Sequence, residues 1–138
     1  MAVIEHTPGS TEVWIQDLLC ALLGALHREQ PTVLELGGFL GHTSARLAEH
    51  LETLGGGKLI VVEWDADAPE RADATDARLA DLHIPHVDWR VVRSDALTVI
   101  AEQADDSLDF VYLDDSHEHT HVAQELLALM PKMRAGGS

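Results

Sequence analysis

Val-Leu-Glu-Leu-Gly-Gly-Phe-Leu-Gly-His-Thr-Ser, residues 33–44, is the most informative stretch of this 138-residue chain. An apolar strand ends at Glu35, the backbone turns through Gly37, Gly38 and Gly41, and a helix follows. Glycine lets a ligand approach the backbone closely because it has no Cβ. The unpaired N–H groups at the start of the helix can bind an anion. The stretch predicts a strand–turn–helix unit that holds a nucleotide-like ligand.

The spacing of the glycines separates the possible ligands. A dinucleotide-binding turn requires G-x-G-x-x-G, and a phosphate loop requires G-x-x-x-x-G-K-[ST]. Neither pattern occurs; the acid and the glycines stand at Glu35, Gly37 and Gly41. A nicotinamide-dependent enzyme is therefore disfavoured, and a structural turn without any cofactor is the plain alternative.

Composition restricts the class of protein. The length fits one domain over residues 1–138, and 46% of the residues are hydrophobic. The sequence has no apolar run long enough for a membrane span and no signal-peptide pattern, and Cys20 is its single cysteine. We expect a cytoplasmic protein without a disulfide. The net charge of −15, from 9 basic and 24 acidic residues, argues against a nucleic-acid partner and favours a small-molecule substrate.

Segments with helical and strand-like patterns alternate along the chain. A leading helix is expected at about residues 10–29, followed by a core over 32–138. The expected strands are 32–36, 58–62, 87–92 and 108–113, and the later helices are 43–54, 69–82, 96–103 and 119–133. Such alternation predicts an α/β fold with a doubly wound, Rossmann-like and mostly parallel sheet of strand order 3-2-1-4.

The strand at 108–113 forms an edge in that order. Beyond it the chain has one more helix and then Gly136-Gly137-Ser138, where a further strand would normally begin. A long apolar edge invites pairing with another chain. We therefore expect a truncated fold, or a homo-oligomer or partner that covers this edge.

Each expected strand is followed by a carboxylate at the rim where such sheets bind ligands. Glu63 offers two oxygens to the hydroxyls of a ribose, with a solvated strand-end acid as the alternative. Trp64 could lie against an adenine or simply pack on the protein. Asp95 could accept a hydrogen bond from the adenine amino group, cap the next helix, or do both.

Glu35 and Thr43 belong to the glycine turn itself. We expect Glu35 to orient the turn and any ammonium group of the bound ligand. Thr43 could bind a carboxylate of that ligand, although a hydroxyl in a first helical turn is often only a local cap.

Four motifs together give a family resemblance: Val-Leu-Glu-Leu-Gly, Gly-Lys-Leu-Ile-Val-Val-Glu-Trp-Asp, Ser-Asp-Ala and Asp-Phe-Val-Tyr-Leu-Asp-Asp-Ser-His. From about Thr32 to Gly137 the chain resembles the class I S-adenosylmethionine-dependent methyltransferases. It is most similar to the catechol O-methyltransferase-like and sugar or macrolide O-methyltransferase branch. The cofactor-site residues expected on this basis and from the rim are Glu35, Gly37, Gly38, Gly41, Thr43, Glu63, Trp64, Asp95, Ala96 and Asp114.

The resemblance also implies roles near the transferred methyl group. In the metal-dependent members, the position matching Asp114 is a ligand for Mg²⁺ or Ca²⁺, which makes Asp114 a catalytic and metal-binding candidate and Mg²⁺ an optional cofactor. The further ligands of those members come from a strand that this chain lacks. His117 matches a histidine of the sugar-modifying branch and is the general-base candidate. His117 and His121 could also bind a transition metal, with a polar helix start as the alternative.

Two functional hypotheses follow. The first is S-adenosylmethionine-dependent O-methylation of a small molecule. The second is a catalytically incompetent module that binds S-adenosylmethionine or S-adenosylhomocysteine and acts through a partner or through self-association.

Overall fold

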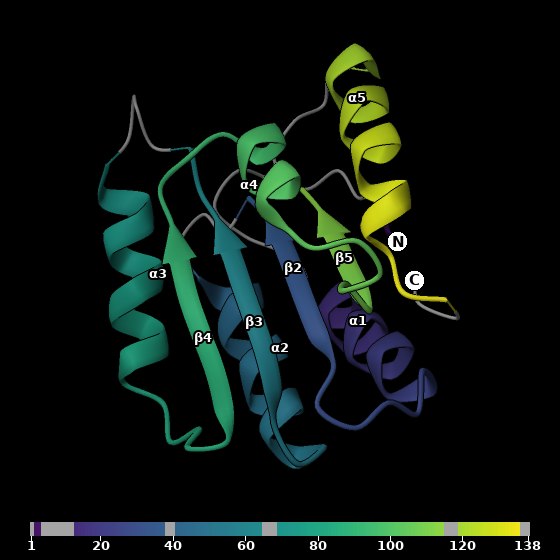
Figure 1. Ribbon diagram of the computed structural model, residues 1–138. Helices are drawn as coiled ribbons and strands as arrows, with labels where there is room; N and C mark the ends of the chain where they lie inside the picture. The colour runs from purple at the N-terminus through teal and green to yellow at the C-terminus, as the bar shows by residue number, and fades with distance from the viewer. Residues whose placement is uncertain (1, 4–12, 38–40, 65–68, 115–118, 136–138) are drawn as a thin grey trace.

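The protein folds into a parallel sheet covered by helices on both faces (Figure 1). The computed structural model describes residues 2–3, 13–37, 41–64, 69–114 and 119–135. The strands are β1 (Ala2–Val3), β2 (Thr32–Leu36), β3 (Gly57–Val62), β4 (Val87–Val92) and β5 (Phe110–Leu113). The helices are α1 (Val13–Ala25), α2 (His42–Thr53), α3 (Glu70–Ala80), α4 (Ala96–Glu102), α5 (His119–Leu129) and the short 3₁₀ helix η1 (Met130–Lys132).

The order of the strands in space is β1-β5-β2-β3-β4, and every pairing is parallel. Without β1, this is the doubly wound 3-2-1-4 arrangement that the sequence predicted, which is confirmed. Because all strands run the same way, their carboxyl ends meet at one edge, the upper edge in Figure 1. Ligands of open α/β sheets bind at this edge.

Two apolar layers hold the helices on the sheet. On one face, α1, α2 and α3 pack on β2, β3 and β5 through a cluster that includes Leu19, Leu47 and Leu79. On the other face, α4 and α5 pack through a cluster that includes Ile100 and Leu129. Successive strand residues alternate between the two clusters, as the two-residue period of a strand requires. The central strands are thus buried on both faces, which explains their nearly continuous apolar sequence.

Several element ends differ from the expected ones. The leading helix α1 ends at Ala25, and His27 follows with a positive φ of 50°, so the chain leaves the helix before Pro31. Pro69, expected as the first residue of the third helix, occupies the N-cap position of α3, which begins at Glu70. Strand β5 begins at Phe110 rather than at residue 108, because Leu108 pairs only through an isolated bridge to Met133.

The edge of β5 is not bare, which corrects the expectation from the sequence. Ala2 and Val3 pair in parallel with Tyr112 and Leu113 at the end of β5. At the other end of this edge, the chain beyond η1 returns, and Arg134 N–H donates to the Leu108 carbonyl at 2.7 Å. The chain's own terminal regions therefore occupy parts of the edge that we expected another chain to cover. Self-association remains a prediction.

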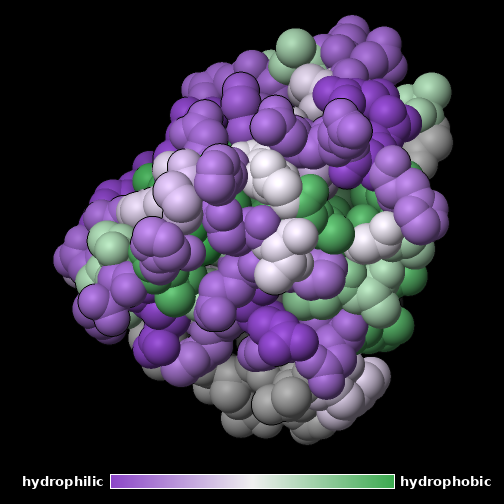
Figure 2. All heavy atoms as spheres, turned by 90° about the horizontal axis from the view of Figure 1, so that it is seen from below, coloured by the Kyte–Doolittle hydropathy of each residue, from purple (hydrophilic) through white to green (hydrophobic). Residues whose placement is uncertain are grey.

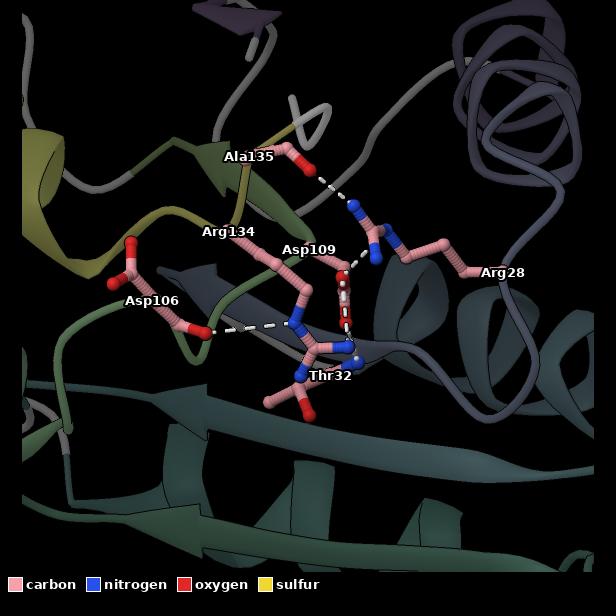
Figure 3. A network of polar contacts seen from close by, with 6 residues as sticks. All are labelled: Arg28, Thr32, Asp106, Asp109, Arg134 and Ala135. Atoms are coloured by element: carbon pink, nitrogen blue, oxygen red, sulfur yellow. Dashed lines mark hydrogen bonds and ion pairs between the residues drawn. The ribbon is translucent and has the colours of Figure 1, made fainter.

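A buried carboxylate, Asp109, joins four segments at the end of the sheet where the strands begin, opposite to their carboxyl ends (Figure 3). It accepts the backbone N–H of Thr32 at 2.8 Å and forms ion pairs with Arg28 Nε at 3.0 Å and Arg134 Nη1 at 3.5 Å. Arg28 also donates to the carbonyl of Ala135. These contacts connect the end of α1, the start of β2, the start of β5 and the segment after η1.

Candidate cofactor-binding site

Backbone hydrogen bonds align the carboxyl ends of the strands. Gly37 N–H donates to the Val62 carbonyl at 2.8 Å, and Asp114 N–H donates to the Leu36 carbonyl at 2.8 Å. Glu63 N–H donates to the carbonyl of Val92 at 3.0 Å. The residues that follow β2, β3 and β5 thus stand side by side at one rim, as the strand-end pattern predicted.

Glu35 lies just inside this rim, beneath the first turn of α2. Its side chain is 1% exposed, and Ser44 Oγ donates a hydrogen bond of 2.5 Å to Glu35 Oε1. Ser44 is fully buried, and Thr43 beside it is buried too. The acid therefore fixes the start of α2 against β2, and its role in orienting the glycine turn stays a prediction.

Burial and neighbouring charges change the ionisation of Glu35. Loss of solvation raises its pKa to about 8 from 4.5, the nearby carboxylates of Asp114 and Glu63 add to the rise, and the Ser44 hydrogen bond opposes it. Three acids from three strands therefore lie close enough to interact. A ligand that carries positive charge, such as a sulfonium with an ammonium group, would stabilise the ionised forms of these carboxyl groups and is therefore favoured at the rim.

Glu63 and Trp64 follow β3 at the rim. Glu63 is buried, with 4% of its side chain exposed, whereas the side chain of Trp64 is 63% exposed. An exposed indole next to a buried acid provides a flat apolar surface beside a hydrogen-bond acceptor. This is the combination expected for an adenosine. The alternative that Trp64 simply packs on the protein does not explain why most of its side chain is exposed.

Asp95 caps α4. It accepts Thr98 N–H at 3.0 Å and Thr98 Oγ1–H at 2.6 Å, and these hydrogen bonds hold the pKa of Asp95 below its usual range. The capping role considered for this residue is therefore confirmed. Ala96, the first residue of α4, is buried. A role of either residue toward adenine stays a prediction.

Asp114 ends β5 and is 5% exposed. The hydroxyl of the fully buried Tyr112 donates to Asp114 Oδ2 at 3.2 Å. The tyrosine thereby orients the carboxylate at the rim.

The glycine turn differs from the expectation in one respect. Gly37 and Gly41 both have a positive φ, 94° and 86°, a conformation that glycine adopts at low cost. A Cβ on Gly41, however, would lie 2.8 Å from Thr75 Cα in α3. Gly41 is therefore required for packing between α2 and α3, whether or not a ligand binds. A substitution of Gly41 is not a clean test of ligand binding.

Two predicted site residues, Gly38 and His117, lie outside the described residues. In the part of the chain that is described, no three residues among His, Cys, Asp and Glu form a metal-binding group. His121 Nε2 instead lies 3.7 Å from Glu125 Oε1. The expectation of Mg²⁺ at Asp114 gains no support.

Sequence reasoning missed Ser44 and Tyr112, which hold the two rim acids Glu35 and Asp114. A carboxylate at the end of a buried strand needs a hydrogen-bond donor, which indicates that a hydroxyl lies near each acid. The sequence does not single out which one, since Thr32 and Thr43 are nearer to Glu35 than Ser44 is, and Tyr112 and Ser116 both stand two residues from Asp114.

Comparison with known proteins places the chain in a family. The profile described as "Methyltransferase domain" matches residues 34–138, so the chain belongs to this family. Its motifs and fold are those of the class I S-adenosylmethionine-dependent methyltransferases on the O-methyltransferase branch, which confirms the resemblance. A search of curated proteins finds no match.

Solved structures with the same fold include several methyltransferases. The O-methyltransferase TomG from Streptomyces achromogenes, involved in tomaymycin synthesis and solved with SAM, is 25% identical, with a TM-score of 0.61 and 87% of this chain and 52% of TomG covered. An O-methyltransferase from Bacillus cereus in complex with SAH is 18% identical, with a TM-score of 0.62 and coverages of 88% and 54%. A SAM-dependent methyltransferase from Aquifex aeolicus is 19% identical, with a TM-score of 0.61 and coverages of 83% and 57%. This chain thus spans about half the length of each.

None of the helices within the described ranges is long and apolar enough to cross a membrane.

Proposed function

We propose that this chain is the cofactor-binding domain of an S-adenosylmethionine-dependent methyltransferase that methylates a hydroxyl group of a small molecule. The observation that carries the proposal is the rim where Glu35, Glu63 and Asp114 stand together beside the positive-φ glycine turn. Family membership over residues 34–138 supports it. The solved relatives named as O-methyltransferases, with SAM or SAH bound, favour the same cofactor and acceptor atom.

The residues of the rim fit the parts of this cofactor. Glu63 would accept hydrogen bonds from the ribose hydroxyls, and Trp64 would lie on the adenine. Asp95 and Ala96 at the start of α4 would border the same base. The glycine turn would let the methionine part approach the backbone, beside Thr43 and Glu35.

The cofactor supplies a methyl group on a sulfonium, and the protein has to position the acceptor oxygen in line with it. Asp114 follows β5 at the rim and accepts a hydrogen bond from Tyr112, which supports a role for it beside the reacting groups. We propose that Asp114 binds the acceptor hydroxyl and that His117 takes its proton as general base.

Titration with S-adenosylmethionine by calorimetry tests the proposal. We expect one-to-one binding, and Trp64→Ala should weaken it by about tenfold, the usual size of a lost stacking contact with a base. Trp64 is 63% exposed, so its loss should leave the fold intact. Trp14→Ala is the comparison, because Trp14 on α1 is 61% exposed, much like Trp64, but does not follow a strand of the sheet.

Equal affinities of the two tryptophan variants would contradict the proposed site, and the absence of binding by the folded wild type would contradict the function. An assay of methyl transfer to hydroxylated acceptors then separates an enzyme from a module that binds the cofactor without catalysis. Binding without any transfer would favour the second hypothesis.

A further inference from the structure

A groove crosses the start of the sheet, at the end opposite to the rim. It has a volume of about 340 Å³, at the lower limit of small-molecule sites. The polar and charged residues that line it are Thr32, Lys58, Asp88, Arg90, Gln103 and Ser107. The first four come from β2, β3 and β4, and the last two follow α4.

The strand register places the charged side chains on one face. Thr32, Lys58 and Asp88 are partners across β2, β3 and β4, and Arg90 lies two residues beyond Asp88 on the same face. From strand geometry, the Cα atoms of Lys58 and Arg90 are about 8 Å apart. In Figure 1 this face is turned toward the viewer, and α4 covers only its upper part. The view from below shows that this end of the molecule is mainly hydrophilic (Figure 2).

The two cations of the groove differ from most of the basic residues elsewhere. In a chain of net charge −15, ion pairs with carboxylates neutralise Arg28, Arg46, Arg93, Lys132 and Arg134. Neither Lys58 nor Arg90 has an ion pair within the described part of the chain, although Asp88 lies beside them. A lysine and an arginine that line the same hollow and form no ion pair with the neighbouring Asp88 suit a doubly charged anion.

The neutral side chains of the groove use their hydrogen-bond donors on the backbone and keep their oxygen atoms as acceptors. Gln103 Nε2 donates to the Val99 carbonyl at 3.0 Å, and Ser107 Oγ donates to the Ala104 carbonyl at 2.6 Å. The side-chain oxygens of both residues can still accept a hydrogen bond. Together with the carboxylate of Asp88, they suit the hydroxyl groups of a ligand rather than its anionic part.

We propose that this groove binds a small phosphorylated hydroxy compound. Lys58 and Arg90 hold the phosphate, and Asp88, Gln103 and Ser107 accept hydrogen bonds from the hydroxyls. The repulsion between Asp88 and the phosphate sets the orientation of the ligand. The groove is separate from the cofactor rim, because Lys58 and Glu63 are five residues apart along β3, a distance of about 16 Å. The proposal therefore does not depend on the methyltransferase function.

Calorimetric titration with glycerol phosphate and with inorganic phosphate, at fixed ionic strength, tests the groove. The wild type should bind glycerol phosphate saturably with one-to-one stoichiometry. The double variant Lys58→Gln/Arg90→Gln should bind at least about tenfold more weakly, since it loses two charge-assisted contacts. The control Arg46→Gln/Lys132→Gln has the same net charge and should bind like the wild type. Circular dichroism checks that both variants are folded.

A second pair of variants tests the role of the acid. Asp88→Asn should strengthen the binding of inorganic phosphate, because the repulsion is removed, and glycerol phosphate should gain less, because a hydroxyl loses its charged acceptor. The matched control Asp76→Asn, exposed on α3, should change neither. Equal losses in both double variants would show that only overall charge matters and would overturn the proposal. The same conclusion would follow if the wild type showed no saturable binding.

Discussion

Glu35 combines two requirements that conflict in a single residue. Its carboxyl group is buried next to the other acids of the rim, which disfavours its charged form, while the hydroxyl of Ser44 donates to it. Because burial and the neighbouring acids outweigh the Ser44 hydrogen bond, the pKa of Glu35 is about 8. At neutral pH most of the Glu35 carboxyl groups are therefore protonated, and the approach of a cationic ligand should favour release of the proton.

This pKa predicts how the stability of the protein depends on pH. Because the pKa is about 8 in the folded chain against 4.5 as its ordinary value, the folded state binds more protons between these values. The contribution of Glu35 to the free energy of unfolding is complete below pH 4.5, falls as the pH rises, and levels off above about 8. In Glu35→Gln this decline, roughly a few kcal/mol in size, should be absent. Urea unfolding of both proteins from pH 5 to 9 measures it.

The control for this experiment is Glu102→Gln, an exposed acid on α4. Its unfolding free energy should follow the wild type across the whole range. If the difference between the wild type and Glu35→Gln were constant with pH, Glu35 would be ionised in the folded protein throughout.

At the level of single residues, the sequence predicted the acids of the rim but not the side chains that donate hydrogen bonds to them. Glu35, Glu63 and Asp114 could be recognised because each ends an apolar strand. Ser44 could not be assigned, since the sequence does not fix which hydroxyl in the first turn of α2 points back to β2. Trp64 could be named but not placed, because its exposure depends on how the chain leaves β3.

The contact between α2 and α3 depends on one glycine. Gly41 is the N-cap of α2, with φ 86°, and the space where a Cβ would lie is occupied by the backbone of Thr75 at 2.8 Å. Thr75 itself is fully buried and donates to the carbonyl of Arg71 at 3.0 Å, so it cannot withdraw without disturbing α3. A side chain at position 41 must therefore separate the two helices.

We predict that Gly41→Ala lowers the free energy of unfolding by about 3 kcal/mol, the sum of backbone strain and overpacking. Gly55→Ala is the matched variant, since its φ is 100° but nothing lies within 4 Å of the added Cβ. It should lose only about 1 kcal/mol, from strain alone. Thermal and urea unfolding compare the two, and equal losses would show that the contact with Thr75 relaxes at little cost.

The sequence predicted helices and strands where the hydrophobic pattern was long, but it did not predict the residues at which they end. The strands β2, β3 and β4 were expected within one residue of their observed bounds. Burial on both faces leaves a nearly continuous apolar run in β2 and β3, whereas β4 at the edge alternates apolar and charged residues in its first half. The end of α1 was misplaced, because the positive φ of His27 is not encoded by a glycine or proline. Strand β1 was missed entirely, since a strand of two residues is too short to leave a pattern in the sequence.

At the scale of the whole molecule, segments from the early and the late part of the chain both lie along the edge of β5. The sequence indicated an uncovered edge because it shows the order of strands but not the return of remote segments. The structure places Ala2 and Val3 beside one end of β5 and Met133 beside Leu108. We expect that the rest of this edge can still pair with a second copy of the chain, so that the protein dimerises. Sedimentation at increasing concentration measures this, and a monomer at all concentrations would contradict it.

Asp109 connects the segment after η1, which lies beside β5, to the start of the sheet and the end of α1. It is fully buried, yet Arg28 and Arg134, more than 100 residues apart in sequence, both pair with it, and it accepts the N–H of Thr32 (Figure 3). A buried acid with three partners leaves uncompensated charges and an unpaired N–H group when it is removed. No sequence pattern predicts this, because the partners are brought together only by the complete fold.

We expect Asp109→Ala to lower the free energy of unfolding by about 3 kcal/mol. Asp109→Asn should lose less, because its amide oxygen can still accept the N–H of Thr32. The comparison is Asp17→Ala, which removes an exposed pair with Arg46 and should cost less than about 1 kcal/mol. Urea unfolding gives the three values. If Asp109→Ala were as stable as Asp17→Ala, the two arginines would be held by other contacts, and the closure of the β5 edge would not depend on this carboxylate.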